Sequence, residues 1–322
     1  MTDPKPTVLV FAALDRSVKT GLGGHCNLIE TDGADIARLA PEVAATIRAV
    51  ACIGRFDNAD LDRLPNLELI ASFGVGYDGI DARYAAGRGI IVTNTPDVLT
   101  EEVADATIGL LINTIRQLPR AEAWLRAGHW ARGETYPLSP LTLRGRSVGI
   151  FGLGRIGKAI ARRVEAFGLP VVYHSRRPAE DVSYRYYSSL VELAGAVDTL
   201  ISAVPGGSAT DRVIGREIFE ALGPNGVFVN VGRGSTVDEE ALIDALGNGT
   251  IAAAGLDVFA NEPVVPIRLL ELGNATVLPH IAAATLDTRA AVAGLVVDNV
   301  LRWFSHGRAL TPVPESVAAR AR

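Results

Sequence analysis

The sequence predicts an α/β fold of two doubly wound, parallel-sheet domains with a cleft between them. Short apolar runs rich in Val and Ile alternate with helical patterns along all 322 residues, which is typical of parallel sheets covered by helices. A G-x-G-x-x-G run that starts at Gly152 lies in mid-chain, so one such domain begins near that point. The length is sufficient for two domains of ordinary size.

Composition and charge narrow the classes of function. The chain is 48% hydrophobic but only 6% aromatic, which suits buried parallel strands. A net charge of −5 gives no reason to expect nucleic acid or an anionic membrane as a partner. Apolar stretches stay well below the ~18 residues of a membrane span, and the one at the N-terminus is too short for a signal peptide. We therefore expect a soluble, cytoplasmic protein.

The two cysteines, Cys26 and Cys52, are isolated in the sequence and form no C-x-x-C motif. Isolated thiols fit a reducing compartment, and we interpret each as a small buried hydrophobic residue. We expect no metal site.

The first hundred residues alternate strand and helix signals, which predicts the first parallel sheet. The Gly-Leu-Gly-Gly run at 21–24 is not interpreted as a phosphate loop, because no strand leads into it and no clear helix follows. The expected strands are 7–12, 48–53, 67–72 and 90–94, with helical patterns at 35–39 and 42–47.

A glycine loop at 71–81 follows the end of a predicted strand. Doubly wound sheets bind ligands beyond the carboxyl ends of their strands. Consecutive backbone N–H groups near Val75, Gly76 and Tyr77 could form a nest for a small carboxylate. A tight turn without a ligand is the alternative.

A long helical pattern follows the break at Pro96 and Asp97. Thr100 is a candidate N-cap, and an apolar stripe continues to about Leu118, which indicates a helix that connects the domains. A second amphipathic piece spans 120–127. The next segment, 128–143, has no clear periodicity and carries Trp130 and Tyr136. These rings could cover a neighbouring subunit or the substrate site, or Trp130 could anchor a surface loop.

Residues 147–177 read as strand, glycine turn, helix and strand. Gly152 allows the tight turn, Gly154 lets a pyrophosphate approach the backbone, and Gly157 lets helix and strand pack closely. The helix N-terminus offers unpaired N–H groups to phosphates. This setting predicts dinucleotide binding, although a glycine turn with only a packing role remains the alternative.

The end of the second strand of this unit indicates which dinucleotide binds. NAD sites usually place an acid there for the ribose 2′-OH, but this chain has His174, Ser175, Arg176 and Arg177, and no acid before Glu180. A hydroxyl and two guanidinium groups suit a 2′-phosphate, so we predict NADP(H). The alternative is that both arginines are solvated and NAD binds.

The rest of the chain continues the second sheet. A final helical pattern from about 286 to 304 should return to the first domain and make that domain discontinuous. The expected strands are 198–204, 226–231, 251–256 and 275–278, and the expected helices are 189–194, 214–222 and 238–247.

Three candidate catalytic residues each follow one of these strands. Hydride transfer to a 2-oxo acid needs a cation for the oxo-carboxylate, a proton donor, and a group that holds the donor charged and oriented. Arg233, flanked by glycines that leave its guanidinium unobstructed, suits the carboxylate. His280 and Glu262 make a sensible acid–base pair, because a neighbouring carboxylate favours the charged imidazole. Each residue alone could also be an ordinary surface or loop residue.

These residues lie in segments that resemble the D-isomer-specific 2-hydroxyacid dehydrogenase family. Order and spacing agree over nearly the whole chain, and HSRRP at 174–178 is most similar to the NADPH-preferring glyoxylate/hydroxypyruvate reductases. The segments are GVGYDGID at 74–81, GLGRIG at 152–157, NVGRGSTVDEEAL at 230–242, GLDVFANEP at 255–263 and LPHIA at 278–282.

The resemblance implies a Rossmann-like architecture and a homodimer. Residues 1–99 and 287–322 would form a discontinuous, flavodoxin-like substrate-binding domain, and residues 100–286 the dinucleotide-binding domain. His280 would be the proton donor, Glu262 its partner and Arg233 the substrate clamp. The backbone at Val75 and Gly76 would hold the substrate carboxylate. The expected cofactor-binding residues are Gly152, Gly154, Arg155, Ile156, Gly157, Ser175, Arg176, Arg177, Val204, Pro205, Val231 and Asp257, with Asp257 at the nicotinamide carboxamide.

The expected activity is NADPH-dependent reduction of a small 2-oxo acid of the glyoxylate or hydroxypyruvate type. Reductases of larger 2-oxo acids are the alternative, and a dinucleotide-sensing corepressor is a remote one. Pro-Gly-Gly at 205–207 departs from the family's Pro-Leu-Thr and could alter the adenosine side of the cofactor site. Glu262 argues against formate dehydrogenases, which carry Gln as the partner of the histidine.

Overall fold

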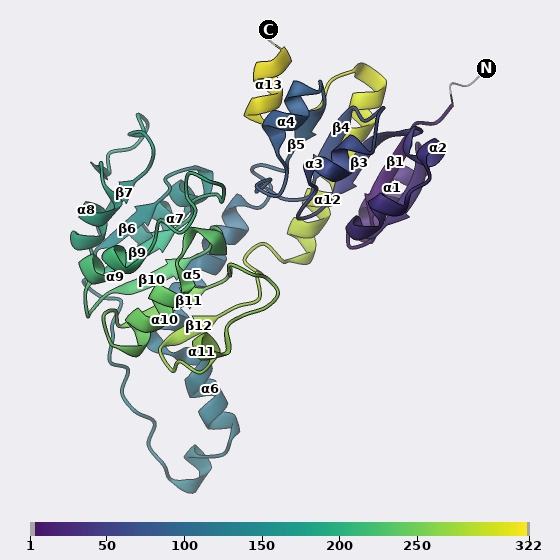
Figure 1. Ribbon diagram of the computed structural model, residues 1–322. Helices are drawn as coiled ribbons and strands as arrows, with labels where there is room; N and C mark the ends of the chain where they lie inside the picture. Colours follow the sequence, from purple (N-terminus) through teal and green to yellow (C-terminus); the bar gives the residue numbers. More distant parts are fainter. Residues whose placement is uncertain (1–3, 321–322) are drawn as a thin grey trace. The chain divides into compact units, whose positions relative to one another are not determined.

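The computed structural model describes residues 4–320 and divides the chain into two compact units (Figure 1). Unit 1 comprises the N-terminal part to Leu99 together with the chain from Thr285, and unit 2 comprises Thr100–Ala284. Residues 1–3, 321 and 322, which the sequence assigned to the first domain, lie outside the described residues. The second boundary lies two residues earlier than expected, because Thr285 caps the returning helix: its side chain accepts a hydrogen bond from the Thr288 N–H.

Unit 1 contains a five-stranded parallel sheet in the order β2-β1-β3-β4-β5, which is the flavodoxin-type order. Four strands lie where apolar runs predicted them. The strand β2 was not predicted, because its sequence of mostly exposed and half-buried residues lacks an apolar run. The strands are β1 (Thr7–Phe11), β2 (Asn27–Thr31), β3 (Ile47–Cys52), β4 (Leu69–Ser72) and β5 (Ile91–Thr93).

The helices of unit 1 include the returning helix, whose residues Ala293, Val296 and Val300 are buried at helical spacing in the core of this unit. The prediction of a helix over 42–47 was wrong for its second half, because α2 ends at Ala44 and Ile47 begins β3. Residues 21–24 end α1 and lead into β2, so they form no strand–glycine–helix turn. The elements are α1 (Arg16–Gly23), η1 (Gly33–Arg38), α2 (Pro41–Ala44), α3 (Asn58–Asp62), α4 (Ala82–Gly87), α12 (Leu286–His306) and α13 (Pro314–Arg320).

Unit 2 contains a seven-stranded parallel sheet in the order β12-β11-β10-β9-β6-β7-β8, which confirms the doubly wound fold. The chain changes direction across the sheet between the neighbours β6 and β9. β8 was not predicted, because it is a short, polar edge strand. The strands are β6 (Val148–Phe151), β7 (Val171–His174), β8 (Arg185–Tyr187), β9 (Thr199–Ser202), β10 (Val227–Asn230), β11 (Ala253–Leu256) and β12 (Ala275–Val277).

Helices cover this sheet, and α5 packs closely on β11. A Cβ on Gly255 would overlap the Thr114 hydroxyl of α5, so glycine permits this approach. Thr100 begins α5 within the helix rather than outside it as an N-cap, which corrects the prediction. The elements are α5 (Thr100–Arg116), α6 (Leu118–Arg126), η2 (Trp130–Arg132), α7 (Arg155–Ala166), α8 (Leu190–Gly195), α9 (Arg216–Leu222), η3 (Gly234–Thr236), α10 (Glu239–Gly247) and α11 (Ile267–Leu270).

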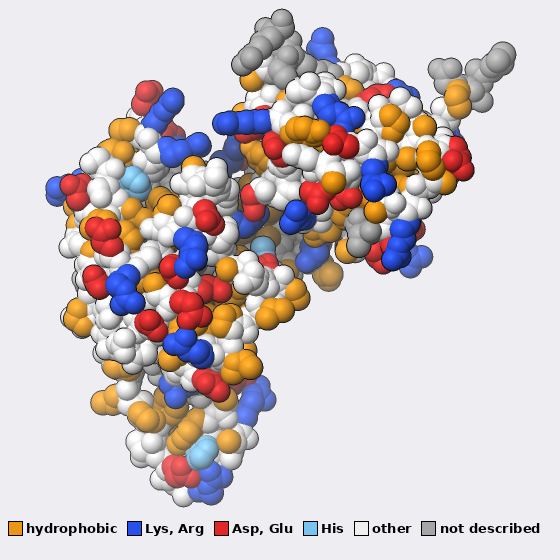
Figure 2. All heavy atoms as spheres, in the orientation of Figure 1, with side chains coloured by type: hydrophobic (Ala, Val, Ile, Leu, Met, Phe, Trp, Pro, Cys, Tyr) orange, Lys and Arg blue, Asp and Glu red, His pale blue; other side chains and the backbone are white. Residues whose placement is uncertain are grey.

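Residues 118–143, here called the arm, extend away from the sheet of unit 2 (Figure 1). Trp124 stacks on His129 and contacts Tyr136 edge to face, so the arm has its own small cluster. Hydrophobic side chains lie along its surface, with charged groups at the tip (Figure 2). Trp130 is 68% exposed and Leu138 95% exposed.

Both cysteines are buried free thiols, as expected, and burial raises the pKa of Cys52 to about 12. Within residues 4–320, no helix combines the length and apolar character that crossing a bilayer requires. The same residues contain no group of three or more His, Cys, Asp or Glu side chains placed to hold a metal ion.

Candidate active site

The carboxyl edge of the unit 2 sheet carries most of the predicted positions. Parallel strands end at one edge, so residues that follow different strands are brought together there. The residues that follow successive strands are Gly152 after β6, Ser175 after β7, Val204 after β9, Val231 after β10, Asp257 after β11 and His280 after β12.

His280 and Glu262 form a direct pair. The imidazole Nδ1 lies 2.7 Å from Glu262 Oε2, and Glu262 Oε1 accepts a hydrogen bond of 2.9 Å from the Phe259 N–H. The second bond fixes the carboxylate, and the carboxylate in turn orients the ring, leaving Nε2 for another partner. His280 has a φ of +53°, in the left-handed region where a non-glycine residue is strained.

Asp257 holds the backbone that carries His280. Its two carboxylate oxygens accept hydrogen bonds from the N–H groups of Ile281 at 2.8 Å and Ala282 at 2.9 Å. Burial raises the pKa of the Asp257 carboxyl above its usual value, while these two bonds act in the opposite direction. Asp257 therefore secures the strained His280 turn, a contact that its place after a strand did not reveal.

Arg233 lies in a loop whose backbone is fixed from several sides. The buried Asn230 accepts from the Gly232 N–H at 3.1 Å and donates to the Arg233 carbonyl at 3.0 Å. The Thr236 hydroxyl donates to the same carbonyl at 2.7 Å, and the Arg233 guanidinium donates to the Gly232 carbonyl at 2.8 Å. Asn230 was not among the predicted residues, because a buried amide at a strand end carries no motif of its own.

The glycines that flank Arg233 serve close backbone packing. A Cβ on Gly232 would overlap the Val204 carbonyl, and a Cβ on Gly234 would overlap the backbone of Phe259. The expectation that they keep the guanidinium unobstructed therefore misses their main role. Because neither residue has a Cβ, the Arg233 loop can pack directly on the loop after β9 and on the segment that leads to Glu262.

The glycine fingerprint has a geometry that fits a dinucleotide. Gly152 has a φ of +97°, and a Cβ on Gly157 would overlap the Gly152 carbonyl. No side chain caps the N-terminus of α7, and the space where a Gly154 Cβ would stand is open. Gly154 and the helix end thus leave room and N–H donors for phosphate oxygens, beside Arg155 and Ile156, while Gly152 permits the positive φ and the close approach of the Ala203–Val204 segment.

The segment after β7 holds the three residues predicted to choose NADP(H). Arg176 and Arg177 are exposed, and within residues 4–320 their side chains form no hydrogen bond or ion pair. The Ser175 hydroxyl donates to the Arg177 carbonyl at 2.6 Å, so it supports the turn itself. Lys158 of α7 forms an ion pair with Asp181 at 2.6 Å, so the carboxylate of Asp181 already has a cation as its partner.

Unit 1 presents the loop that carries Val75 and Gly76. The Asn94 amide donates to the Val75 carbonyl at 2.8 Å, and the Gly74 N–H donates to Thr95 Oγ1 at 3.1 Å. Within the described part of the chain, the N–H groups of Val75 and Gly76 have no acceptor. Two adjacent free donors are what a carboxylate nest requires.

The loop after β3 braces this glycine loop. The Phe56 N–H donates to the Gly79 carbonyl at 3.0 Å, and a Cβ on Gly79 would lie 2.6 Å from the Gly54 carbonyl oxygen. Arg55, between them, is 80% exposed at its side chain and lies 3.4 Å from Asp57. Arg55 is therefore a surface residue paired with a neighbouring acid, and we assign it no part in the candidate site.

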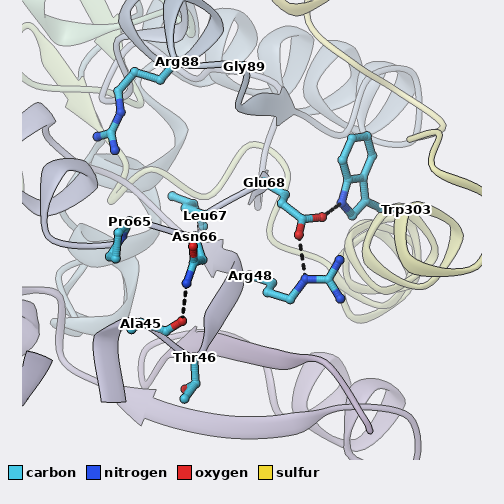
Figure 3. A pocket seen from close by; sticks show the side chains of 10 residues that line it. All are labelled: Ala45, Thr46, Arg48, Pro65, Asn66, Leu67, Glu68, Arg88, Gly89 and Trp303. Carbon is cyan, nitrogen blue, oxygen red and sulfur yellow. Dashed lines mark hydrogen bonds and ion pairs between the residues drawn. The ribbon is translucent and has the colours of Figure 1, made fainter. Parts of the chain in front are cut away.

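A hollow of about 700 Å³ lies at the opposite, amino edge of the unit 1 sheet (Figure 3). Glu68 occupies its wall and accepts from Arg48 Nε at 2.6 Å and from Trp303 Nε1 at 2.9 Å. Arg88, the other charged residue of the lining, pairs with Asp62 at 2.7 Å. Because these charges are paired and the strands only begin here, we assign this hollow no part in the candidate site.

Comparison with known proteins gives matches to one family. A model described as "D-isomer specific 2-hydroxyacid dehydrogenase, NAD binding domain" matches residues 108–282. The chain is 48% identical over 250 residues to a glyoxylate/hydroxypyruvate reductase of Arabidopsis thaliana, covering 78% of this chain and 79% of that protein. It is 46% identical over 253 residues to a hydroxyphenylpyruvate reductase of Plectranthus scutellarioides, covering 79% and 80%.

A solved structure is similar over almost the full length. It is an NADPH-dependent glyoxylate/hydroxypyruvate reductase from Sinorhizobium meliloti in complex with NADP and malonate. The two chains are 53% identical, the match covers 97% of this chain and 98% of that one, and the TM-score is 0.95.

Proposed function

The chain belongs to the family of D-isomer specific 2-hydroxyacid dehydrogenases, and we propose that it reduces glyoxylate and hydroxypyruvate with NADPH. The product is the 2-hydroxy acid, of D configuration where it is chiral. The observation that carries this proposal is the His280–Glu262 pair, which lies at the same sheet edge as Arg233 and the glycine fingerprint.

We assign the proton transfer to His280. Glu262 engages Nδ1, so Nε2 is the atom that donates a proton to the oxygen of the substrate carbonyl. Asp257 and the Phe259 N–H keep both partners in place, so the donor is oriented before substrate binds.

We assign substrate binding to Arg233 and to the amides of Val75 and Gly76. A guanidinium fork binds a carboxylate through two hydrogen bonds and draws charge from the adjacent carbonyl. The two free amides of the unit 1 loop add donors for a carboxylate. Small 2-oxo acids carry a carboxylate next to a carbonyl, the two groups that these donors suit.

The cofactor would be held by the fingerprint and the segment after β7. Gly152, Gly154 and Gly157, with the start of α7, suit the pyrophosphate, and Arg176 and Arg177 suit a 2′-phosphate. When bound, NADPH supplies the hydride. Val204, Pro205 and Val231 follow neighbouring strands and would line its site.

Steady-state assays of the purified chain test the proposed function. Glyoxylate, hydroxypyruvate and hydroxyphenylpyruvate should each be assayed with NADPH and with NADH. We expect kcat/KM to be highest for the two smaller acids and at least about tenfold higher with NADPH than with NADH. Equal use of NADH would refute the cofactor assignment. A clear preference for hydroxyphenylpyruvate would favour the larger-substrate alternative, which the Plectranthus relative keeps open.

Gly234→Ala should lower kcat/KM by about 10²-fold without unfolding the chain. The added methyl group overlaps the Phe259 backbone, so the Arg233 loop and the segment leading to Glu262 must separate, and misplacement by ~1 Å can cost that factor. Steady-state kinetics and circular dichroism measure the effect. Gly247→Ala is the control, because its Cβ would have no neighbour within 4 Å. Equal activity of both variants would contradict the close packing as a requirement of catalysis.

We also propose that the protein is a homodimer and acts in the cytoplasm. The exposed Leu125, Trp130 and Leu138 of the arm support an interface with a second copy, because water-exposed apolar groups gain from burial. Analytical ultracentrifugation should show a dimer that Leu138→Asp weakens; a wild-type monomer would refute it.

The free thiols of Cys26 and Cys52 support a reducing compartment, which cell fractionation can check.

A further inference from the structure

We propose that Tyr186, on the edge strand β8, is a positioning residue for the 2′-phosphate of NADP(H). Its hydroxyl holds the backbone that presents Arg176 and Arg177. This inference rests on the proposed use of NADPH and extends it to a residue outside the arginine segment.

The contact is a hydrogen bond from the Tyr186 hydroxyl to the Ser175 carbonyl, 3.2 Å long. In a planar trans peptide the next N–H points opposite to the carbonyl, so this bond also directs the Arg176 N–H away from Tyr186. The peptide that leads into the arginines therefore takes its orientation from β8 rather than from the arginines themselves.

Further contacts make the segment 175–179, here called the arginine turn, rigid before a ligand binds. The hydroxyl of the buried Tyr173 accepts from the Ala179 N–H at 2.9 Å and so holds the far end of the turn. The Ser175 hydroxyl closes the turn on the Arg177 carbonyl at 2.6 Å. Two tyrosine hydroxyls thus fix the two ends, while both guanidinium groups stay exposed.

Tyr186 is itself fixed by ring packing. Its ring lies 5.5 Å from that of Tyr173 and stacks on His174 at 6.2 Å, with an interplanar angle of 22°. His174 also stacks on Phe151, and its Nδ1 donates to the Tyr187 carbonyl at 2.8 Å. The cluster links the end of β6, where the glycine turn begins, to the arginine turn after β7.

The charges around the turn favour an anion there. Lys158, in the first turn of α7, forms an ion pair with Asp181 at 2.6 Å. Arg176 and Arg177 are then cations without a protein partner among residues 4–320. A preset turn loses little backbone freedom when its two cations bind a phosphate, which raises affinity.

Calorimetric titration with adenosine 2′,5′-bisphosphate and with 5′-ADP tests the proposal without turnover. Tyr186→Phe keeps the ring and removes the hydroxyl. Its affinity for the 2′-phosphorylated nucleotide should fall by about fivefold, the equivalent of one hydrogen bond, with 5′-ADP affinity unchanged. Tyr184→Phe is the matched control, because its hydroxyl donates to Glu165 at 2.7 Å and lies outside the arginine turn. An equal loss in both variants, or for both nucleotides, would overturn the proposal.

A double-mutant cycle separates positioning from general stability. In an Arg176→Ala/Arg177→Ala background, adding Tyr186→Phe should change the affinity ratio of the two nucleotides no further; a second fivefold change would overturn the proposal. If the wild-type protein itself binds both nucleotides equally, the assignment of NADPH fails. If it prefers the 2′-phosphate and Tyr186→Phe keeps that preference, only the role of Tyr186 fails.

Discussion

Replacing His280 by Ala should reduce kcat for glyoxylate by about 10³-fold, while the affinity for NADPH changes little. The loss follows from removal of the proton donor, because general acid catalysis by a positioned side chain contributes about 10²–10⁴ in rate. The ring belongs to unit 2 and binds Glu262 through Nδ1, so its loss leaves the glycine turn and the arginine turn intact. Stopped-assay kinetics and fluorescence titration of NADPH measure the two quantities separately.

Glu262→Gln is the companion variant for this prediction. The amide oxygen can still accept from the Phe259 N–H, but the amide NH2 then faces His280 Nδ1 as a donor, and the negative charge beside the ring is lost. Its kcat should fall, but by less than in His280→Ala. Turnover of His280→Ala at the wild-type rate would remove His280 from the mechanism, and a change in NADPH affinity alone would place its role in cofactor binding.

Arg233→Ala should lower kcat/KM for glyoxylate by at least about 10²-fold. A charged group that loses its partner at a binding surface costs about 2–5 kcal/mol, and here the partner is the substrate carboxylate. Arg233→Lys should recover only part of this loss, because an ammonium keeps the charge but cannot form two parallel bonds. Inhibition by oxamate, a non-reactive analogue with an adjacent carboxylate and carbonyl, should weaken in the same order.

The control for Arg233 is Arg268→Ala. Arg268 is an exposed arginine of unit 2 that pairs with Glu240 at 2.7 Å, so its removal should leave kinetics and oxamate inhibition unchanged. If Arg233→Ala and Arg268→Ala behaved alike, general loss of positive charge would explain the effect and the role of Arg233 as a clamp would be refuted.

The sequence was sufficient for the parts of the fold that depend on local pattern. Continuous apolar runs predicted the central strands, because buried parallel strands need apolar residues on both faces. The strands β2 and β8 lie at sheet edges, where one side is open to water, so their polar sequences carried no such signal. Their omission matters for function, since β8 supplies Tyr186.

Site residues were predictable where their place directly after a strand was enough to bring them to the carboxyl edge of the sheet. His280, Arg233 and Asp257 each follow a strand, and parallel strands end together. What could not be predicted is how the loops touch. The Gly234 contact with Phe259 and the Asp257 bonds to Ile281 and Ala282 join segments some 25 residues apart, and in each case one partner is a backbone group. No side-chain pattern records such contacts before the chain has folded.

The return of α12 to unit 1 has a consequence for the order in which the protein can be assembled. Synthesis proceeds from the N-terminus, and domains fold as units as they emerge. The strands β1–β5 leave the ribosome first, yet the helix that buries Ala293, Val296 and Val300 in their core is made only after all of unit 2. The continuous unit 2 can therefore complete its core while unit 1 still waits for its covering helix, so the part of the chain made first is finished last.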